Sequence, residues 1–106
     1  MGQIVLSDKV EDRLGNLAHI LYEKEYFATM DFAIAYVREL QDTIYNIPNL
    51  IHHKTKNPKV GKYYVRHKPN KKTTYYITFD FKGDRYYIED IINNHEKDYK
   101  KIMGLA

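Results

Sequence analysis

The hydrophobic pattern of this chain changes its period once, near Pro48, and this change restricts the possible folds more than any other feature of the sequence. Before Pro48, apolar residues recur at intervals of three and four, from Val10 to Leu21 and again from Met30 to Ile47. After Gly61 they alternate with polar residues, as they do in strands. A helical half followed by a strand half predicts an α+β domain whose helices cover one side of an antiparallel sheet.

The first half predicts one short strand and two helices. The strand covers Gln3 to Leu6, and Asp8 with Glu11 three residues later forms a capping-box signature for a helix over about 9–24. A second helix is expected over about Met30 to Asn46, where it stops before a proline. Because only a few residues connect the two helices, we expect them to pack as an antiparallel hairpin.

The second half predicts three strands, over 62–68, 73–81 and 85–93, which are rich in Tyr, Val, Ile and Thr. Short turns join them, so neighbouring strands should be antiparallel. The stretch 49–62 has no regular period and is expected to be a loop, and 95–103 should make one or two helical turns. The chain is thus expected to be one domain: an N-terminal strand, a helix hairpin packed on a mainly antiparallel sheet of three to four strands, and a short C-terminal helical tail.

Alternation within the strands assigns side chains to two faces of this meander, although a slip of one residue would exchange the faces. The mostly apolar face, which the helices should cover, is expected to hold Tyr63, Val65, Thr73, Tyr75, Ile77, Phe79, Phe81, Tyr86, Ile88 and Ile92. The opposite face is expected to hold Tyr64, Arg66, Lys68, Thr74, Tyr76, Thr78, Asp80, Arg85, Tyr87 and Glu89.

Charge is distributed unevenly along the chain. Residues 1–50 hold four basic and eight acidic side chains, whereas residues 51–106 hold thirteen and six. Between His52 and Lys72 there are eight Lys or Arg, three His and no acid, and six of the eleven Tyr occur as adjacent pairs in the same half. Such a basic, Tyr-rich segment suits an anionic partner whose bases can stack on phenol rings. The alternative is a lysine-rich loop that only solvates the chain.

Length and composition exclude several classes of protein. The 106 residues fit one domain, and the absence of Cys excludes disulfide scaffolds, thiolate zinc sites and cysteine nucleophiles. No apolar run approaches the roughly twenty residues that span a bilayer, so we expect a cytoplasmic protein without a membrane segment. The adjacent His52 and His53 lack the spacing of a zinc site, and no glycine-rich phosphate loop is present, so we expect neither a metal nor another cofactor.

The order of these elements resembles the RelE/ParE superfamily of toxins from type II toxin–antitoxin and plasmid stabilisation systems, over nearly the whole chain. A helical hairpin closed by an Ile-Pro step and followed by a basic, Tyr-rich meander is an uncommon arrangement. The stretches that carry the resemblance are Ile4–Ser7 leading into Leu14 and Leu17, Phe27–Tyr36, Ile44–Pro48, Tyr75–Phe79, Ile91–Ile92 and His95–Tyr99.

The resemblance implies one of two activities: a metal-independent endoribonuclease that cuts mRNA, often at the ribosome, or a toxin that poisons DNA gyrase without cutting RNA. It places basic residues of the ribonuclease site at Arg66 and Lys68, and a histidine and tyrosine at His95 and Tyr99. Two arginines common in that site are replaced, one by the Thr73–Tyr75 stretch and one, after the histidine, by an acid. An inactive relic that still binds an antitoxin is the remaining alternative.

Metal-free RNA cleavage needs a base, an acid and a cation for the crowded phosphorane. We expect Arg66 to stabilise the phosphorane, His95 to act as base or acid, and Tyr99 to assist or stack a base, with His95 alternatively serving only to cap the tail helix. The expected partners are a cognate antitoxin and RNA, with DNA gyrase as the alternative target. The residues expected to bind RNA or another anionic partner are Lys54, Lys56, Lys62, Tyr64, His67, Lys68, Lys71, Lys72 and Tyr76.

Overall fold

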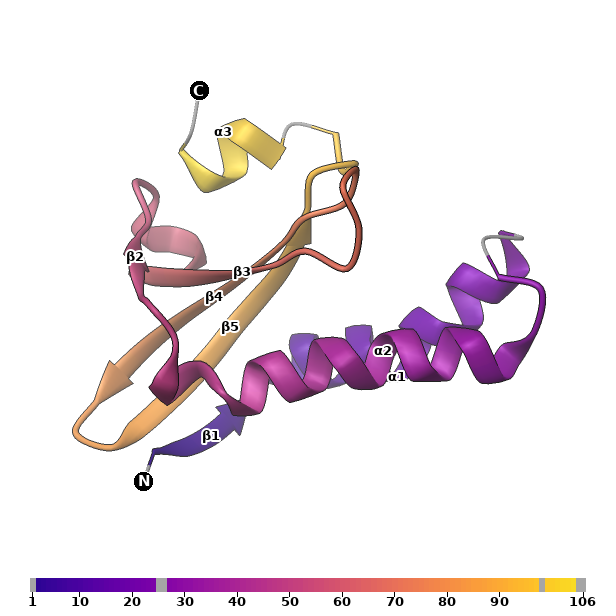
Figure 1. Cartoon of the computed structure of the whole chain (residues 1–106). Helices are drawn as coiled ribbons and strands as arrows, with labels where there is room; N and C mark the ends of the chain where they lie inside the picture. The colour runs from indigo at the N-terminus through magenta and orange to yellow at the C-terminus, as the bar shows by residue number, and fades with distance from the viewer. Residues whose placement is uncertain (1, 25–26, 98, 105–106) are drawn as a thin grey trace.

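A computed structural model of the chain describes residues 2–24, 27–97 and 99–104. It has the predicted α+β architecture, with the hairpin of two helices on one side of a sheet and a short helix on the other side (Figure 1). The elements in chain order are β1 (Gln3–Leu6), α1 (Asp8–Glu23), α2 (Met30–Tyr45), the 3-10 turn η1 (Ile47–Asn49), β2 (His53–Lys54), the 3-10 turn η2 (Pro58–Val60), β3 (Tyr63–His67), β4 (Tyr75–Lys82), β5 (Arg85–Asn93) and α3 (Tyr99–Met103).

The sheet has five strands in the order β1-β5-β4-β3-β2, and all neighbouring pairs are antiparallel except β1 with β5. The additional strand is β2, which lies inside the predicted loop and pairs His53 with Tyr64 and Lys54 with Tyr63. A two-residue strand gives no detectable alternation, so the sequence pattern could not separate it from a loop.

The N-terminal cap of α1 lies one residue before the predicted one. Ser7, rather than Asp8, caps α1, because its side-chain oxygen accepts the backbone N–H of Val10 at 3.2 Å. Asp8 instead lies in the first turn, where its negative charge interacts favourably with the helix dipole. Thr29 caps α2 in the same way through Phe32. No helix within residues 2–24, 27–97 and 99–104 is long and apolar enough to cross a membrane.

The core lies between the helix hairpin and the side of the sheet that faces it, here called the inner face. Helix side chains spaced by three and four residues enter it, in agreement with the predicted stripe. Ile34, also in that stripe, is instead partly exposed at 38%. The buried cluster consists of Val10, Leu14, Val37, Leu40, Ile44, Ile47, Val65, Tyr75, Ile77, Phe79, Ile88 and Ile91.

A β-bulge in β5 makes one face assignment wrong. Phe79 pairs with Ile88 and the preceding residue of β4 pairs with Asp90, so Glu89 is an extra residue in β5. Beyond the bulge the alternation shifts by one position. Ile91, opposite Ile77, therefore enters the core, and Ile92, predicted on the inner face, pairs with Tyr76 on the opposite side.

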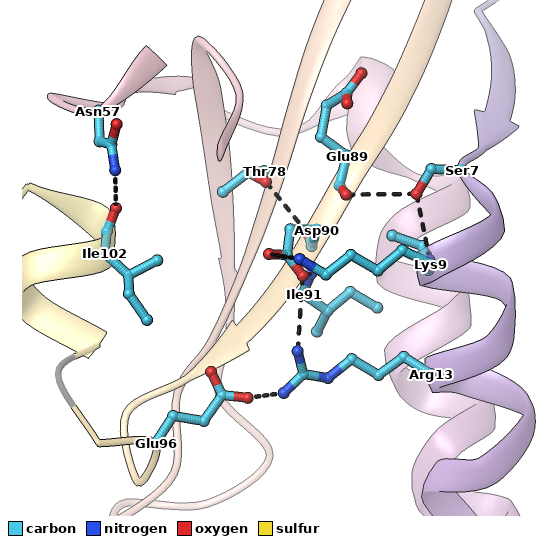
Figure 2. Close-up of polar contacts among 11 residues, drawn as sticks. Ser7, Lys9, Arg13, Asn57, Thr78, Glu89, Asp90, Ile91, Glu96 and Ile102 are labelled. Carbon is cyan, nitrogen blue, oxygen red and sulfur yellow. Dashed lines mark hydrogen bonds and ion pairs between the residues drawn. The ribbon is translucent and has the colours of Figure 1, made fainter. Parts of the chain in front are cut away.

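That opposite side, the outer face, is partly covered by α3. Figure 1 shows α3 on the side of the sheet remote from α1 and α2. Thr78 and Ile92 are fully buried, as is Met103 at the end of α3. The Asn57 side-chain amide donates a hydrogen bond to the Ile102 carbonyl at 2.6 Å and so ties α3 to the segment between β2 and β3 (Figure 2). A second, small buried layer thus lies beneath α3.

Candidate nucleic-acid interface

Four aromatic rings form a continuous row across the outer face. The ring of His53 from β2 stacks on Tyr64 of β3 with 5.2 Å between centroids. Tyr64 meets Tyr76 of β4 edge-on at 5.7 Å, and Tyr76 stacks on Tyr99 of α3 at 6.0 Å with an interplanar angle of 20°. We call His53, Tyr64, Tyr76 and Tyr99 the aromatic row. It presents flat, half-buried rings of the kind on which nucleotide bases stack.

Arg66 lies beside the centre of this row. It is the cross-strand partner of Tyr76 and is exposed to solvent. Burial raises the pKa of Tyr76 above its ordinary value, and the neighbouring Tyr99 and Tyr64 phenols add to this rise, while the positive charge of Arg66 opposes it. Tyr76 is therefore a neutral phenol at physiological pH, able to donate a hydrogen bond next to the Arg66 guanidinium.

The predicted lysines are all exposed and lie in two groups. Lys54, predicted to bind RNA, is not on the outer face, because it pairs with Tyr63 of the inner face while its neighbour His53 stacks on Tyr64 of the outer face. One group follows Arg66 in the connection from β3 to β4, and the other lies in and after β2 at the edge of the sheet. Within residues 2–24, 27–97 and 99–104, ion pairs with carboxylates involve only Lys9, Arg13 and His19, so none of the cations between 54 and 72 is neutralised by an acid. The first group is Lys68, Lys71 and Lys72, and the second is Lys54, Lys56 and Lys62.

His67, one of the residues predicted to bind RNA, is on the inner face instead. Its Nδ1 lies 2.7 Å from the Thr43 hydroxyl of α2, and its Nε2 is buried with no hydrogen-bond partner among the described residues. Burial lowers the pKa of His67, an effect that the charge of Glu39 partly opposes. Since His67 alternates with Arg66, the strand period already indicated that these two side chains point to opposite faces.

His95 lies in the turn after β5, at the end of the sheet next to the lysine-bearing connection. Its Nε2 is 3.0 Å from the Thr73 hydroxyl, and its backbone N–H donates to the Asn93 side chain at 2.8 Å. Arg66 and Tyr99 both adjoin Tyr76, whereas the His95 ring contacts Thr73 of the loop between β3 and β4. The structure thus groups two of the three predicted catalytic residues around Tyr76 and places His95 at the adjoining end of the face.

Two residues that replace expected arginines have structural contacts here. Glu96 forms an ion pair with Arg13 of α1, as Figure 2 shows. Thr73 holds the His95 ring through the hydrogen bond described above. Neither replacement leaves an acid pointing into the aromatic row. Asp98, the fourth residue of the predicted His95–Tyr99 motif, lies outside the described residues.

The outer face is electrically divided. At the end remote from Arg66, Asp80 accepts the backbone N–H of Lys62 at 2.8 Å. Partial burial raises the pKa of Glu89 in the bulge, and the nearby Asp80 charge raises it further. Two neighbouring carboxylates repel phosphate, so a polyanion on this face would lie toward Arg66 and the group of Lys68, Lys71 and Lys72.

The arrangement offers stacking surfaces, neutral phenol donors and one guanidinium, which together suit an unpaired, phosphate-bearing chain. The described residues contain no group of three or more His, Asp, Glu or Cys side chains that could hold a metal ion. Sequence reasoning missed His53 as a member of the row, because its place depends on the very short β2. It also missed the central position of Tyr76, which follows only from the register of β3 and β4.

Comparison of the chain with protein-family models, with curated proteins and with solved structures gave no match.

Proposed function

We propose that this protein binds single-stranded RNA across its outer face and cleaves it without a metal ion, acting as a cytoplasmic toxin that arrests growth. The observation that carries the proposal is the position of Arg66 beside Tyr76 of the aromatic row, near lysines that pair with no carboxylate among the described residues. A cation and neutral phenols at one point are the groups that a strained phosphate needs.

Stacking accounts for the preference for single strands. A base on an aromatic ring contributes about 1–3 kcal/mol, and such stacking requires bases that are not already stacked in a duplex. Tyr64 and Tyr76 are half-buried, so each ring keeps an accessible part for a base while the sheet holds it in place. Lys68, Lys71 and Lys72 would then contact the phosphates that follow.

In the proposed reaction, the 2′-hydroxyl attacks its own phosphate and the 5′ oxygen leaves. Arg66 neutralises the extra charge of the phosphorane. Tyr76 or Tyr99, each a phenol, donates a proton to the departing 5′ oxygen, and His95 at the adjoining end of the face takes the proton of the 2′-hydroxyl of the same nucleotide. Each such contribution is worth typically about 10² to 10³ in rate.

The proposed toxin needs an antitoxin that hides the outer face. An acidic or amphipathic segment that folds across the sheet would satisfy the cations of residues 54–72 and cover the aromatic row. Opposite charge would speed the encounter, and raised salt would weaken it. Binding of a candidate antitoxin that is insensitive to salt would contradict this part of the proposal.

The experiment that tests the function compares Arg66→Ala with Lys82→Ala. Lys82 lies at the far end of β4 and loses the same charge, but it is remote from Tyr76 in sequence and register. We expect Arg66→Ala to lower the cleavage of a single-stranded RNA oligonucleotide by about 10² to 10³ and Lys82→Ala to change it less than about threefold. Equal activity of both variants would refute the proposed site.

A second candidate function is inhibition of DNA gyrase without catalysis, and the helix hairpin provides its support. The hairpin extends beyond the sheet (Figure 1), and Phe32 at 63% and Ile20 at 43% expose large apolar side chains on it. Exposed apolar groups of this kind suit a protein partner. A supercoiling assay beside the RNA assay separates the two functions: gyrase inhibition that survives Arg66→Ala and fails in Phe32→Ser supports the second.

A further inference from the structure

The turn that carries His95 is held from two sides. On one side, the Asn94 side chain accepts the N–H of Thr74 at 2.9 Å and donates to the Lys72 carbonyl at 2.9 Å. The Asn94 backbone N–H also donates to the Thr74 carbonyl at 3.0 Å. These bonds join the turn to the connection between β3 and β4, where Thr73 contacts the His95 ring.

On the other side, the turn is held by α1. Where β1 ends, α1 begins and runs along the edge of β5, and its Arg13 reaches two carboxylates there (Figure 2). One Nη atom of Arg13 lies 3.6 Å from Asp90 of β5, and the other forms an ion pair with Glu96, directly after His95.

The charges around Arg13 balance. Asp90 has a side chain only 9% exposed, and it also pairs with Lys9 of α1 at 2.9 Å while accepting the Ile91 N–H at 2.8 Å. Two cations therefore face two carboxylates. Among the described pairs, Lys9 contacts Asp90 alone, whereas Arg13 contacts both Asp90 and Glu96. Arg13 is therefore the cation of these pairs that links Asp90 to the turn. With both Nη atoms facing carboxylates, the Arg13 guanidinium is a poor phosphate ligand.

We propose that Arg13 is a positioning residue, which fixes the turn through Glu96 and thereby presents His95 at the end of the outer face. The positioning role rests on the proposed function only in the kinetic test, in which RNA cleavage is measured. A guanidinium suits the task, since its rigid fork holds two carboxylates in one geometry. Small displacements of a reacting group cost large factors in rate, about a hundredfold for 1 Å.

The test uses Arg13→Gln, Glu96→Gln, which removes the same ion pair from the side of the turn, and Lys9→Gln as the matched control, which removes the other cation from Asp90. Amide hydrogen exchange of Asn94 and Glu96 reports the turn without any reaction. In Arg13→Gln we expect exchange at least about tenfold faster, because a charged hydrogen bond is lost. Glu96→Gln should speed the exchange about as much as Arg13→Gln does, and Lys9→Gln should leave it within about twofold.

Kinetics provide the second readout. We expect Arg13→Gln to lower the cleavage rate about tenfold to a hundredfold at nearly unchanged RNA affinity, with a similar loss in Glu96→Gln. Unchanged exchange in Arg13→Gln, or equal effects of Lys9→Gln, would overturn the positioning role. If the wild-type protein cuts no RNA, the proposed function fails, but the exchange experiment still decides whether Arg13 holds the turn.

Discussion

Tyr75 and Tyr76 are neighbours in β4, yet the two faces of the sheet give them different environments. Tyr75 is 4% exposed on the inner face, where its hydroxyl bonds to that of Tyr36 at 3.3 Å. Burial, together with Tyr75 and Glu39, strongly raises the pKa of Tyr36. Tyr76 is half-buried on the outer face, between two other rings and beside a guanidinium.

This comparison shows that adjacent tyrosines in a strand point to opposite faces of the sheet, and that each face uses its tyrosine differently. The inner member contributes packing and a buried hydrogen bond, so it should matter mainly for stability. The outer member leaves part of its ring accessible, so it should matter mainly for binding. If the two faces are independent, substitutions on one should leave the property of the other unchanged.

The largest expected effect is on the inner face. Phe79 is fully buried between strands and helices, and its ring contacts those of Tyr63 and Tyr86. We expect Phe79→Ala to lower the free energy of unfolding by about 3–5 kcal/mol, because it removes a large side chain and leaves a cavity. Urea denaturation measures this loss. Phe81→Ala, in the same ring cluster but 40% exposed, is the matched control and should lose less than half as much.

An intermediate effect is expected on the outer side. Replacing Lys71 and Lys72 by Ala should leave the free energy of unfolding within about 0.5 kcal/mol. The dependence of RNA affinity on salt should weaken, with the slope of log K against log salt falling by about 1.4, since each phosphate contact on a single strand contributes about 0.7. Lys24→Ala, on the helix hairpin, should leave the slope unchanged. An unaltered slope in the double variant would place RNA elsewhere.

The smallest expected effect concerns pH and His67. Burial lowers the folded-state pKa of His67 below its unfolded value near 6.5. As pH falls through 6.5, the unfolded chain therefore takes up a proton that the folded protein does not, and stability falls toward the lower folded pKa. Glu39 opposes the effect.

The measurement is the free energy of unfolding between pH 5 and 8, compared with His67→Gln. We expect the free energy of unfolding of His67→Gln to decline less on acidification than that of the wild type. His53→Gln, which alters a histidine of the outer face, should show the full decline of the wild type. Parallel curves for the wild type and His67→Gln would show that burial of this imidazole has no consequence for stability.

Most of the fold could be predicted because its signals are local. The helical stripe and the strand alternation identified the hairpin, the meander and the inner positions of β3 and β4. The error at Ile92 has a definite cause, since one inserted residue in β5 reverses every later position and no local signal marks Glu89 as the insertion.

The candidate site was less predictable because it depends on pairing between distant segments. Arg66 and Tyr99 meet around Tyr76 only once the register is known, and His53 joins them through a strand of two residues. Their chemical roles remain predictions. Arg13 could not be identified at all, because nothing near it in the sequence indicates a contact with Glu96.

The parallel pairing of β1 with β5 also has a consequence for synthesis of the chain. Ser7 and Glu89, which are bonded at this seam, lie 82 residues apart. On the ribosome, β1 can therefore pair with β5 only after most of the chain has been synthesised. The helix hairpin can form earlier, because its residues are close in sequence. A nascent chain paused before β5 would carry an assembled hairpin but no completed outer face, so whatever that face binds could be engaged only after synthesis is nearly finished.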